Sequence, residues 1–93
     1  MPKPLVAIVV PVHNEKDNLE RFHQEVSAVM QSLGDYDWEF VFVDDGSKDG
    51  SFEILRALRA RDARVTALRF PRNFGSHVAI AAGIDYSEGG AAV

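Results

Sequence analysis

The sequence predicts an α/β domain in which a mostly parallel sheet is covered by helices on both faces, a Rossmann-like three-layer α/β/α arrangement. Three apolar runs rich in β-branched residues alternate along the chain with three segments of helical periodicity. Continuous apolar runs are typical of strands that are buried on both faces of a parallel sheet. Alternation of strands and helices favours parallel pairing with crossover helices.

The first run, Leu5–Val10, is predicted to be a strand that Pro11 ends, because proline cannot donate a hydrogen bond to a strand ladder. From Glu15 to Leu33 the apolar residues recur at helical spacing, with charged and amide residues between them. Asn14 is the predicted N-cap of this helix and Gly34 its predicted stop.

The next predicted strand is Trp38–Val43, which runs into Asp44-Asp45-Gly46-Ser47. Asp49-Gly50-Ser51 then opens a second helix, since such residues favour caps and turns. Val65–Phe70 is the third predicted strand, and Pro71 ends it.

A third helix of small residues is predicted around positions 78–84, and Gly89-Gly90 ends it. Ala91-Ala92-Val93 begins a fourth strand that the sequence does not complete. The whole of residues 1–93 is therefore expected to form one domain segment, the N-terminal part of a longer protein.

Composition limits the classes of function. With 46% apolar and 26% charged residues, the 93-residue chain has the balance of a small globular domain. The net charge of −4, with both signs mixed along the chain, gives no indication of a nucleic-acid partner. The absence of cysteine excludes disulfides and thiolate metal sites. No apolar run approaches the ~20 residues that span a bilayer, so we expect a cytoplasmic domain.

Polar residues follow each predicted strand: Pro11–Glu15, Asp44–Ser47 and Arg72–Gly75. In open parallel sheets, ligands bind outside the carboxyl ends of the strands. We therefore expect these three clusters to converge on one edge of the sheet and to form the binding site.

Two interpretations stay open for the acidic residues. One carboxylate of Asp44 and Asp45 can cap the turn while the other accepts hydrogen bonds from a base or a ribose, or both are turn formers. Glu15 is either an acceptor for a nucleoside or a first-turn charge that the helix dipole stabilises. A calcium loop starting at Asp45 is excluded, because its twelfth position is Arg56 where a glutamate is required.

Basic and amide residues follow the third strand. Arg72 and Asn73 are suited to a phosphate or pyrophosphate, with Gly75 allowing a close backbone approach. The alternative is a solvated loop with a glycine at a helix start. The sequence holds neither a P-loop nor a Gly-x-Gly-x-x-Gly motif, so no glycine-rich phosphate cradle is expected.

Taken together, the motifs resemble those of the family 2 glycosyltransferases of the GT-A fold. The resemblance lies in four ordered and correctly spaced segments: Val9–Glu15, Val43–Ser51, Arg72–Gly75 and Ala82–Asp85. It covers essentially the whole chain. The branch resembled most is that of the dolichol- and polyprenyl-phosphate sugar transferases, so the chain would be the nucleotide-binding N-terminal half of such a fold.

The resemblance implies an inverting transferase that moves a sugar from a UDP- or GDP-sugar to a polyprenyl or dolichyl phosphate. His13 stands where a tyrosine is more usual and can still stack on a base. Arg72 and Asn73 would lie near the diphosphate, and no catalytic residue is expected within the chain. The residues whose positions contact or adjoin the nucleoside in the family are Pro11, His13, Glu15, Val43, Asp44 and Asp45.

The resemblance also implies a divalent cation, Mg²⁺ or Mn²⁺, bound by an Asp-x-Asp motif that would follow Val93. The segment alone would then be inactive. The full-length protein is expected at the cytoplasmic face of the membrane, with a homo-oligomer as an open alternative to a monomer. The other hypothesis is a non-enzymatic α/β domain that binds a nucleotide or a partner through the same edge. A phosphoacceptor receiver domain is disfavoured, because Phe70-Pro71-Arg72 occupies the place of its required third-strand aspartate.

Overall fold

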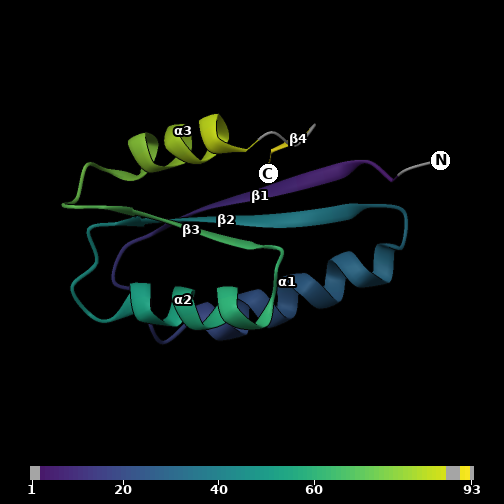
Figure 1. Ribbon diagram of the computed structural model, residues 1–93, viewed down its shortest axis with the longest axis horizontal. Coiled ribbons are helices and arrows are strands. Elements are labelled where there is room, and N and C mark those ends of the chain that lie inside the picture. Colours follow the sequence, from purple (N-terminus) through teal and green to yellow (C-terminus); the bar gives the residue numbers. More distant parts are fainter. Residues whose placement is uncertain (1–2, 88–90, 93) are drawn as a thin grey trace.

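The computed structural model describes residues 3–87 and 91–92 and has a four-stranded parallel sheet of strand order β3-β2-β1-β4. Helices α1 and α2 cover one face of the sheet and α3 covers the other (Figure 1). The predicted three-layer class is therefore confirmed. The elements are β1 (Leu5–Val12), α1 (Leu19–Leu33), β2 (Asp37–Asp45), α2 (Ser51–Arg61), β3 (Val65–Phe70), α3 (Ser76–Tyr86) and β4 (Ala91–Ala92).

The two faces of the sheet carry separate cores. Side chains alternate along β2, so Phe40 and Phe42 point to the face of α1 and α2, while Val41 and Val43 point to the face of α3. The two phenylalanine rings stack with centroids 5.5 Å apart. Because both faces are covered, β2 is apolar at consecutive positions, which is the pattern seen in the sequence.

A glycine allows α3 to pack closely on the second face. A Cβ atom at Gly83 would lie 2.4 Å from Val9 Cγ1 and 3.2 Å from Val43 Cγ2, both buried strand residues. The helix therefore rests directly on β1 and β2, and its small residues reflect this close approach.

Pro11 does not end the first strand as predicted. β1 continues to Val12, and Pro11 pairs in register with Val43 of β2. On its other side, β1 pairs with the described part of β4 at Val6 and Ala7, well before Pro11. Pro11 thus lies where the ladder has one described neighbour, and there a residue without an N–H is tolerated.

The first helix also begins later than predicted. It starts at Leu19 with Asn18 as N-cap residue, while Asn14 has a positive φ of 55° in the preceding turn. Asn14 is held in that turn by bonds to Ser47 and Lys48 in the loop after β2. The predicted stop is confirmed, since Gly34 ends the helix with φ 73°.

The remaining bounds follow the prediction closely. The second helix starts at Ser51 and the third strand covers Val65–Phe70, whereas β2 is longer than expected and includes both Asp44 and Asp45. Ala91 and Ala92 form the predicted fourth strand, and Gly89, Gly90 and Val93 lie outside the described residues. Over the described ranges, no helix has the length and apolar character needed to cross a membrane.

Candidate functional site

The loops after β1, β2 and β3 meet at one backbone oxygen. His13 Nδ1 lies 2.9 Å from the carbonyl oxygen of Asp45, and Asn73 Nδ2 lies 3.2 Å from the same atom. The three loops lie together at the left-hand end of the sheet in Figure 1. This juxtaposition confirms the predicted convergence of the strand-end clusters, and it places residues 60 positions apart in contact.

The contact with Asp45 determines the tautomer of His13. A carbonyl oxygen only accepts, so Nδ1 of the ring must carry the proton and donate it. Nε2 lies 3.4 Å from the side-chain amide nitrogen of Asn14. His13 thus presents an exposed imidazole with a fixed orientation at the edge of the sheet.

The loops after β1 and β2 are joined through Asn14. Its backbone N–H donates to Ser47 Oγ at 2.9 Å, and its side-chain oxygen accepts from the Lys48 N–H at 2.8 Å. Asparagine tolerates the left-handed conformation that this turn requires. These bonds explain why Asn14 does not cap α1, since its side chain is already engaged with a loop more than 30 residues away.

Asp49 joins the same two loops further along. One carboxylate oxygen accepts from the Lys16 N–H at 3.2 Å, and the other accepts from the hydroxyl and the N–H of Ser51. The hydroxyl of Ser51 is the main cause that holds the pKa of Asp49 below its ordinary value, so the carboxylate stays ionised. The Ser51 hydroxyl also accepts from the backbone N–H of Glu15 at 3.0 Å.

Glu15 lies in the turn before α1 rather than in its first helical turn. Its carboxylate accepts from the side-chain amide of Asn18 at 2.9 Å and is exposed. The interpretation of Glu15 as a first-turn charge is therefore wrong, because the helix begins four residues later. Its role as a nucleoside acceptor stays a prediction.

Asp44 and Asp45 point to opposite faces of the sheet, because β2 extends through both and successive side chains alternate. Asp45 is 2% exposed, and both of its carboxylate oxygens accept hydrogen bonds from the loop before α3. The Phe74 N–H donates to Oδ1 at 2.7 Å, and the Gly75 N–H donates to Oδ2 at 3.0 Å. Asn73 Nδ2 adds a third bond at 3.1 Å. Three of the roughly four acceptor positions of this carboxylate are thus occupied, and the role of Asp45 as a nucleoside acceptor stays a prediction.

Asp44 is the turn former of the pair. Its side chain is fully buried, and Oδ1 accepts from the Ser47 N–H at 3.0 Å. Oδ2 is buried without a partner among residues 3–87 and 91–92. Because the two carboxylates diverge, the pair does not fit one metal ion. The described residues hold no cluster of three or more His, Asp or Glu side chains that could.

Pro11 is half-buried at the end of β1, and Val43 is fully buried at the neighbouring position of β2. They are register partners near the ends of β1 and β2, and the Val43 side chain is wholly buried in the core under α3. Their expected contact with a nucleoside stays a prediction, and the structure assigns Val43 a packing role.

A hollow of about 800 Å³ opens between the loops after the three strands. Six of its lining residues belong to the three expected strand-end clusters: His13, Asn14, Gly46, Ser47, Arg72 and Asn73. Lys48 and Arg69 also line it and were not expected as site residues. The signal for Arg69 was a charge inside an otherwise apolar strand, next to the strand end.

Comparison with known proteins agrees with this geometry. Residues 7–92 match the model of the family described as glycosyl transferase family 2.

The chain belongs to glycosyl transferase family 2.

Relatives in this family are similar over nearly the whole chain. A glycosyltransferase of Bacillus subtilis (strain 168), YkcC, is 46% identical over 87 residues, which are 94% of this chain and 27% of the relative. The bactoprenol glucosyl transferase of Shigella phage SfV is 41% identical over 88 residues, 95% of this chain and 28% of the relative. The undecaprenyl-phosphate 4-deoxy-4-formamido-L-arabinose transferase of Pseudomonas paraeruginosa (strain DSM 24068 / PA7) is 44% identical over 89 residues. This match covers 95% of this chain and 26% of that protein. The chain therefore spans little more than a quarter of the length of each of these relatives.

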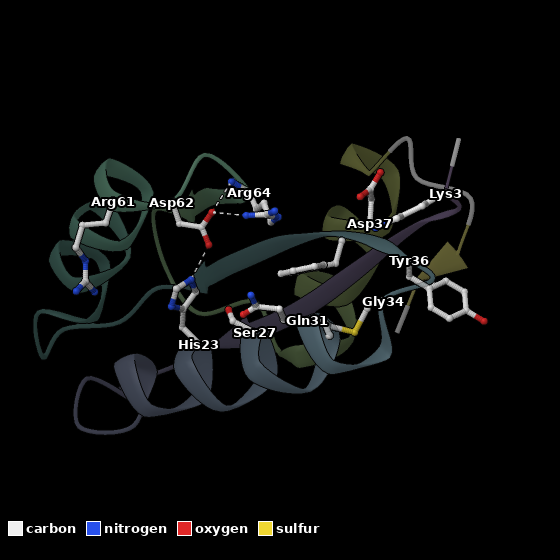
Figure 2. A pocket seen from close by; sticks show the side chains of 12 residues that line it. Lys3, His23, Ser27, Gln31, Gly34, Tyr36, Asp37, Arg61, Asp62 and Arg64 are labelled. Atoms are coloured by element: carbon white, nitrogen blue, oxygen red, sulfur yellow. Dashed lines mark hydrogen bonds and ion pairs between the residues drawn. The ribbon is translucent and has the colours of Figure 1, made fainter. Parts of the chain in front are cut away.

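A second hollow, of about 550 Å³, lies at the opposite end of this family 2 domain, near the starts of β2 and β3 (Figure 2). Three of its lining residues, His23, Asp62 and Arg64, are paired with one another. His23 Nε2 lies 2.8 Å from Asp62 Oδ2, and Arg64 lies 3.7 Å from the other oxygen of Asp62. Arg64 also stacks on Trp38, 4.3 Å from the ring centroid. These pairs join α1 to the segment between α2 and β3, which is a structural role.

Replacing Asp62 by asparagine is expected to destabilise the family 2 domain in a pH-dependent way. Burial favours a raised pKa for Asp62, but the Arg64 N–H, the His23 bond and the charges of both residues outweigh it. They hold the pKa below the ordinary 3.8. A carboxyl with a lowered folded pKa stabilises the fold above its unfolded pKa and loses that contribution as the pH falls through the folded value.

We therefore expect Asp62→Asn to cost ~1–2 kcal/mol near pH 5 and progressively less below about pH 3.8. Urea denaturation between about pH 5 and pH 2 measures the difference, below the ordinary titration range of histidine. Asp35→Asn is the matched control, since Asp35 is exposed and makes the same change of charge. A cost for Asp62→Asn that stayed constant down to pH 2 would contradict the assignment.

Proposed function

We propose that this chain is the donor-binding part of an enzyme that transfers a sugar, with inversion, from a UDP- or GDP-sugar to a polyprenyl phosphate. The observation that carries the proposal is the meeting of the three strand-end loops at the Asp45 carbonyl. It brings an oriented imidazole, two amides and two arginines to the edge where open parallel sheets bind ligands. The names of two relatives, a bactoprenol glucosyl transferase and an undecaprenyl-phosphate transferase, support the acceptor class.

The nucleoside would lie across the loops after β1 and β2. His13 offers the face of an oriented ring for stacking on the base. Glu15 is exposed beside it and can accept from a ribose hydroxyl. Asp45 contributes mainly by holding the Asn73–Gly75 loop in place.

In the proposed reaction an oxygen of the lipid phosphate attacks the anomeric carbon from the side opposite the leaving diphosphate. The new C–O bond forms as the bond to the diphosphate breaks, which inverts the configuration. The attacking oxygen is already anionic, so no general base within this chain is required. Mg²⁺ or Mn²⁺, held by residues outside positions 1–93, would neutralise the leaving diphosphate. Because the acceptor is a membrane lipid, we place the full-length protein at the cytoplasmic face of the membrane.

Calorimetric titration of the purified chain with UDP and GDP tests the donor site. We expect one of them to bind, and we expect His13→Ala to weaken binding roughly tenfold, because base stacking on an aromatic ring contributes about 1–3 kcal/mol. His77→Ala is the control, since His77 is exposed on α3 and does not line the hollow. Failure of both nucleotides to bind a folded chain would refute the proposal. In the full-length protein, NMR of the product tests inversion at the anomeric carbon.

A further inference from the structure

Strand β3 leaves one side of its backbone unpaired among the described residues. It is the outermost strand of the order β3-β2-β1-β4 and, within residues 3–87 and 91–92, pairs only with β2. The Phe40 N–H donates to the Arg64 carbonyl at 2.8 Å, so Arg64 and every second residue after it direct their backbone groups to β2. Ala67 and Arg69 lie in the other phase and direct their N–H and C=O groups away from the sheet. Such a row of donors and acceptors can pair with another extended chain.

A shallow hollow of about 320 Å³ lies along this free edge, between α2 and the end of α3. Phe52, Arg56 and Arg59 of α2 line it and recur at intervals of four and three residues, which puts them in one row on the helix. The hollow is also lined by β3 and by Tyr86 of α3, which is 53% exposed. It is therefore placed to receive side chains of a strand that is added to β3.

The α2 side of this edge is positively charged. Arg59 makes no ion pair in the described part of the chain and donates to a backbone carbonyl at 2.9 Å. Arg56 has one acidic partner, Glu53, at 3.4 Å. The Arg69 Cζ atom lies 4.8 Å from the ring centroid of Phe52, so a third guanidinium lies on the same side. In a chain of net charge −4, this local excess of positive charge is complementary to an acidic partner.

The α3 side of the edge carries acidic residues instead. Glu39 and Asp85 line a neighbouring hollow of about 530 Å³ together with Tyr86. Successive side chains of an extended chain point to opposite faces. An added strand would therefore place acids against the arginines at every second position, with uncharged residues between them facing Glu39 and Asp85. Acids at consecutive positions would bring like charges together on the α3 side.

A second copy of this chain matches the edge poorly. Two copies joined through a two-fold axis would pair β3 with β3 in antiparallel orientation and continue the sheet. Helix α2 of one copy would then lie on the same face as α2 of the other, so that the two rows of arginines would approach each other. Like charges opposite one another across a strand pair are destabilising. The charge of the edge therefore favours a different, acidic partner.

We propose that the free edge of β3 binds an extended acidic segment of a partner protein, which adds a strand to the sheet. The backbone of that segment bonds with the outward N–H and C=O groups of Ala67 and Arg69. Its acidic side chains, at every second position, lie against Arg56 and Arg59. This surface serves a protein partner and does not depend on the proposed transfer reaction.

Fluorescence anisotropy of labelled peptides tests the surface on the purified chain. The probe is a capped peptide of alternating glutamate and threonine, about as long as β3. A peptide of alternating lysine and threonine tests the sign of the charge. A third peptide has the composition of the probe, but all its glutamates stand together in one block, so it tests the alternation.

Two variants of the chain separate backbone pairing from charge. Ala67→Pro removes an N–H that points away from the sheet, so the ladder with β2 keeps its bonds. Arg56→Gln combined with Arg59→Gln removes two charges from the edge. Arg21→Gln combined with Arg61→Gln is the matched control, because it removes two arginines that pair with acids away from the edge. Arg69 is left unchanged, since it also lines the nucleotide hollow. Circular dichroism verifies that each variant is folded.

We expect the glutamate–threonine peptide to bind and the lysine–threonine peptide not to bind. The Arg56→Gln, Arg59→Gln variant should weaken binding roughly fivefold, and Ala67→Pro should weaken it by a similar factor. The control variant should bind as the unchanged chain does. Added salt should weaken binding, because the charges lie at the surface.

Several results would overturn the proposal. Failure of the alternating acidic peptide to bind the folded chain would refute it, and equal binding of the block peptide would show charge attraction without strand pairing. A folded Ala67→Pro variant that binds as well as the unchanged chain would exclude backbone pairing, and if that variant does not fold, the peptides and the arginine variants still decide. Dimerisation of the chain alone, measured by sedimentation and abolished by Ala67→Pro, would assign the edge to a second copy. None of these outcomes affects nucleotide binding, so the proposed donor site is tested separately.

Discussion

Replacing Asp45 by asparagine is expected to lower the free energy of unfolding by about 3 kcal/mol, an unusually large cost for a strand-end residue. The side chain is 2% exposed, and it accepts from the Phe74 N–H on one oxygen and from the Gly75 N–H on the other. An asparagine has one acceptor oxygen, so in either orientation its amide group faces a buried N–H donor. One donor is left unpaired, and the loop before α3 is released.

Asp44→Asn is the matched control, one residue away and equally buried. Asp44 accepts one hydrogen bond, from the Ser47 N–H, and its second oxygen has no partner within the described part of the chain. Asparagine can keep that bond and has no second one to lose, so we expect the free energy of unfolding to fall by less than about 1 kcal/mol. Urea denaturation followed by circular dichroism measures both variants. Equal costs would show that the hydrogen bonds of Asp45 do not anchor the loop.

Gly46→Ala is expected to have a comparably large effect, about 2–4 kcal/mol, and to disturb the hollow itself. The glycine has φ +72°, and a Cβ atom there would lie 2.4 Å from both the Arg72 carbonyl carbon and the Asn73 nitrogen. These are backbone atoms, so the overlap is relieved only by moving the loop after β3 as a whole. Arg72 and Asn73 would move with it, and nucleotide binding should weaken in the same variant.

Gly50→Ala separates the steric overlap from the backbone strain. Gly50 also has a positive φ, +89°, but a Cβ atom there meets nothing within 4 Å. Its replacement should lower the free energy of unfolding by about 1–2 kcal/mol, because alanine is strained in the left-handed conformation. The nucleotide affinity should stay unchanged. Thermal unfolding and calorimetry on the two variants measure both quantities. If Gly50→Ala lowered stability and nucleotide affinity as much as Gly46→Ala, the close approach of the two loops would not be the cause of the Gly46→Ala effect.

Elements specified by local residues were predictable from the sequence. The third strand, Val65–Phe70, and the start of the second helix at Ser51 agree with the prediction, because apolar runs and turn residues act over a few positions. The predicted start of the first helix was wrong, because it depends on a residue far away in the sequence. Asn14 looks like a cap, but its side chain bonds the Lys48 N–H, and no local rule anticipates a partner on another loop.

The same division holds for the site. The alternation of strands and helices was sufficient to predict that the loops after the strands converge, because parallel strands place their carboxyl ends at one edge. The role of Asp45 was not predictable, since its donors at positions 73–75 are brought to it by the packing of α3 on the sheet. Arg69 was not predicted at the site, because its position around one hollow with Lys48 and Arg72 depends on the folded structure.

The amino-acid sequence by itself determined the three-layer class, the order of the elements, the family resemblance and the edge that carries the site. These follow from periodicity and from motifs that need only neighbouring residues. The tertiary structure alone decided the direction of each carboxylate of the Asp44-Asp45 pair, the tautomer of His13 and the pairing of arginines with aromatic rings. The bonds of Asp45 and His13 and the stacking of Arg69 on Phe52 join segments that are far apart in the sequence, and their partners are known only after the chain has folded.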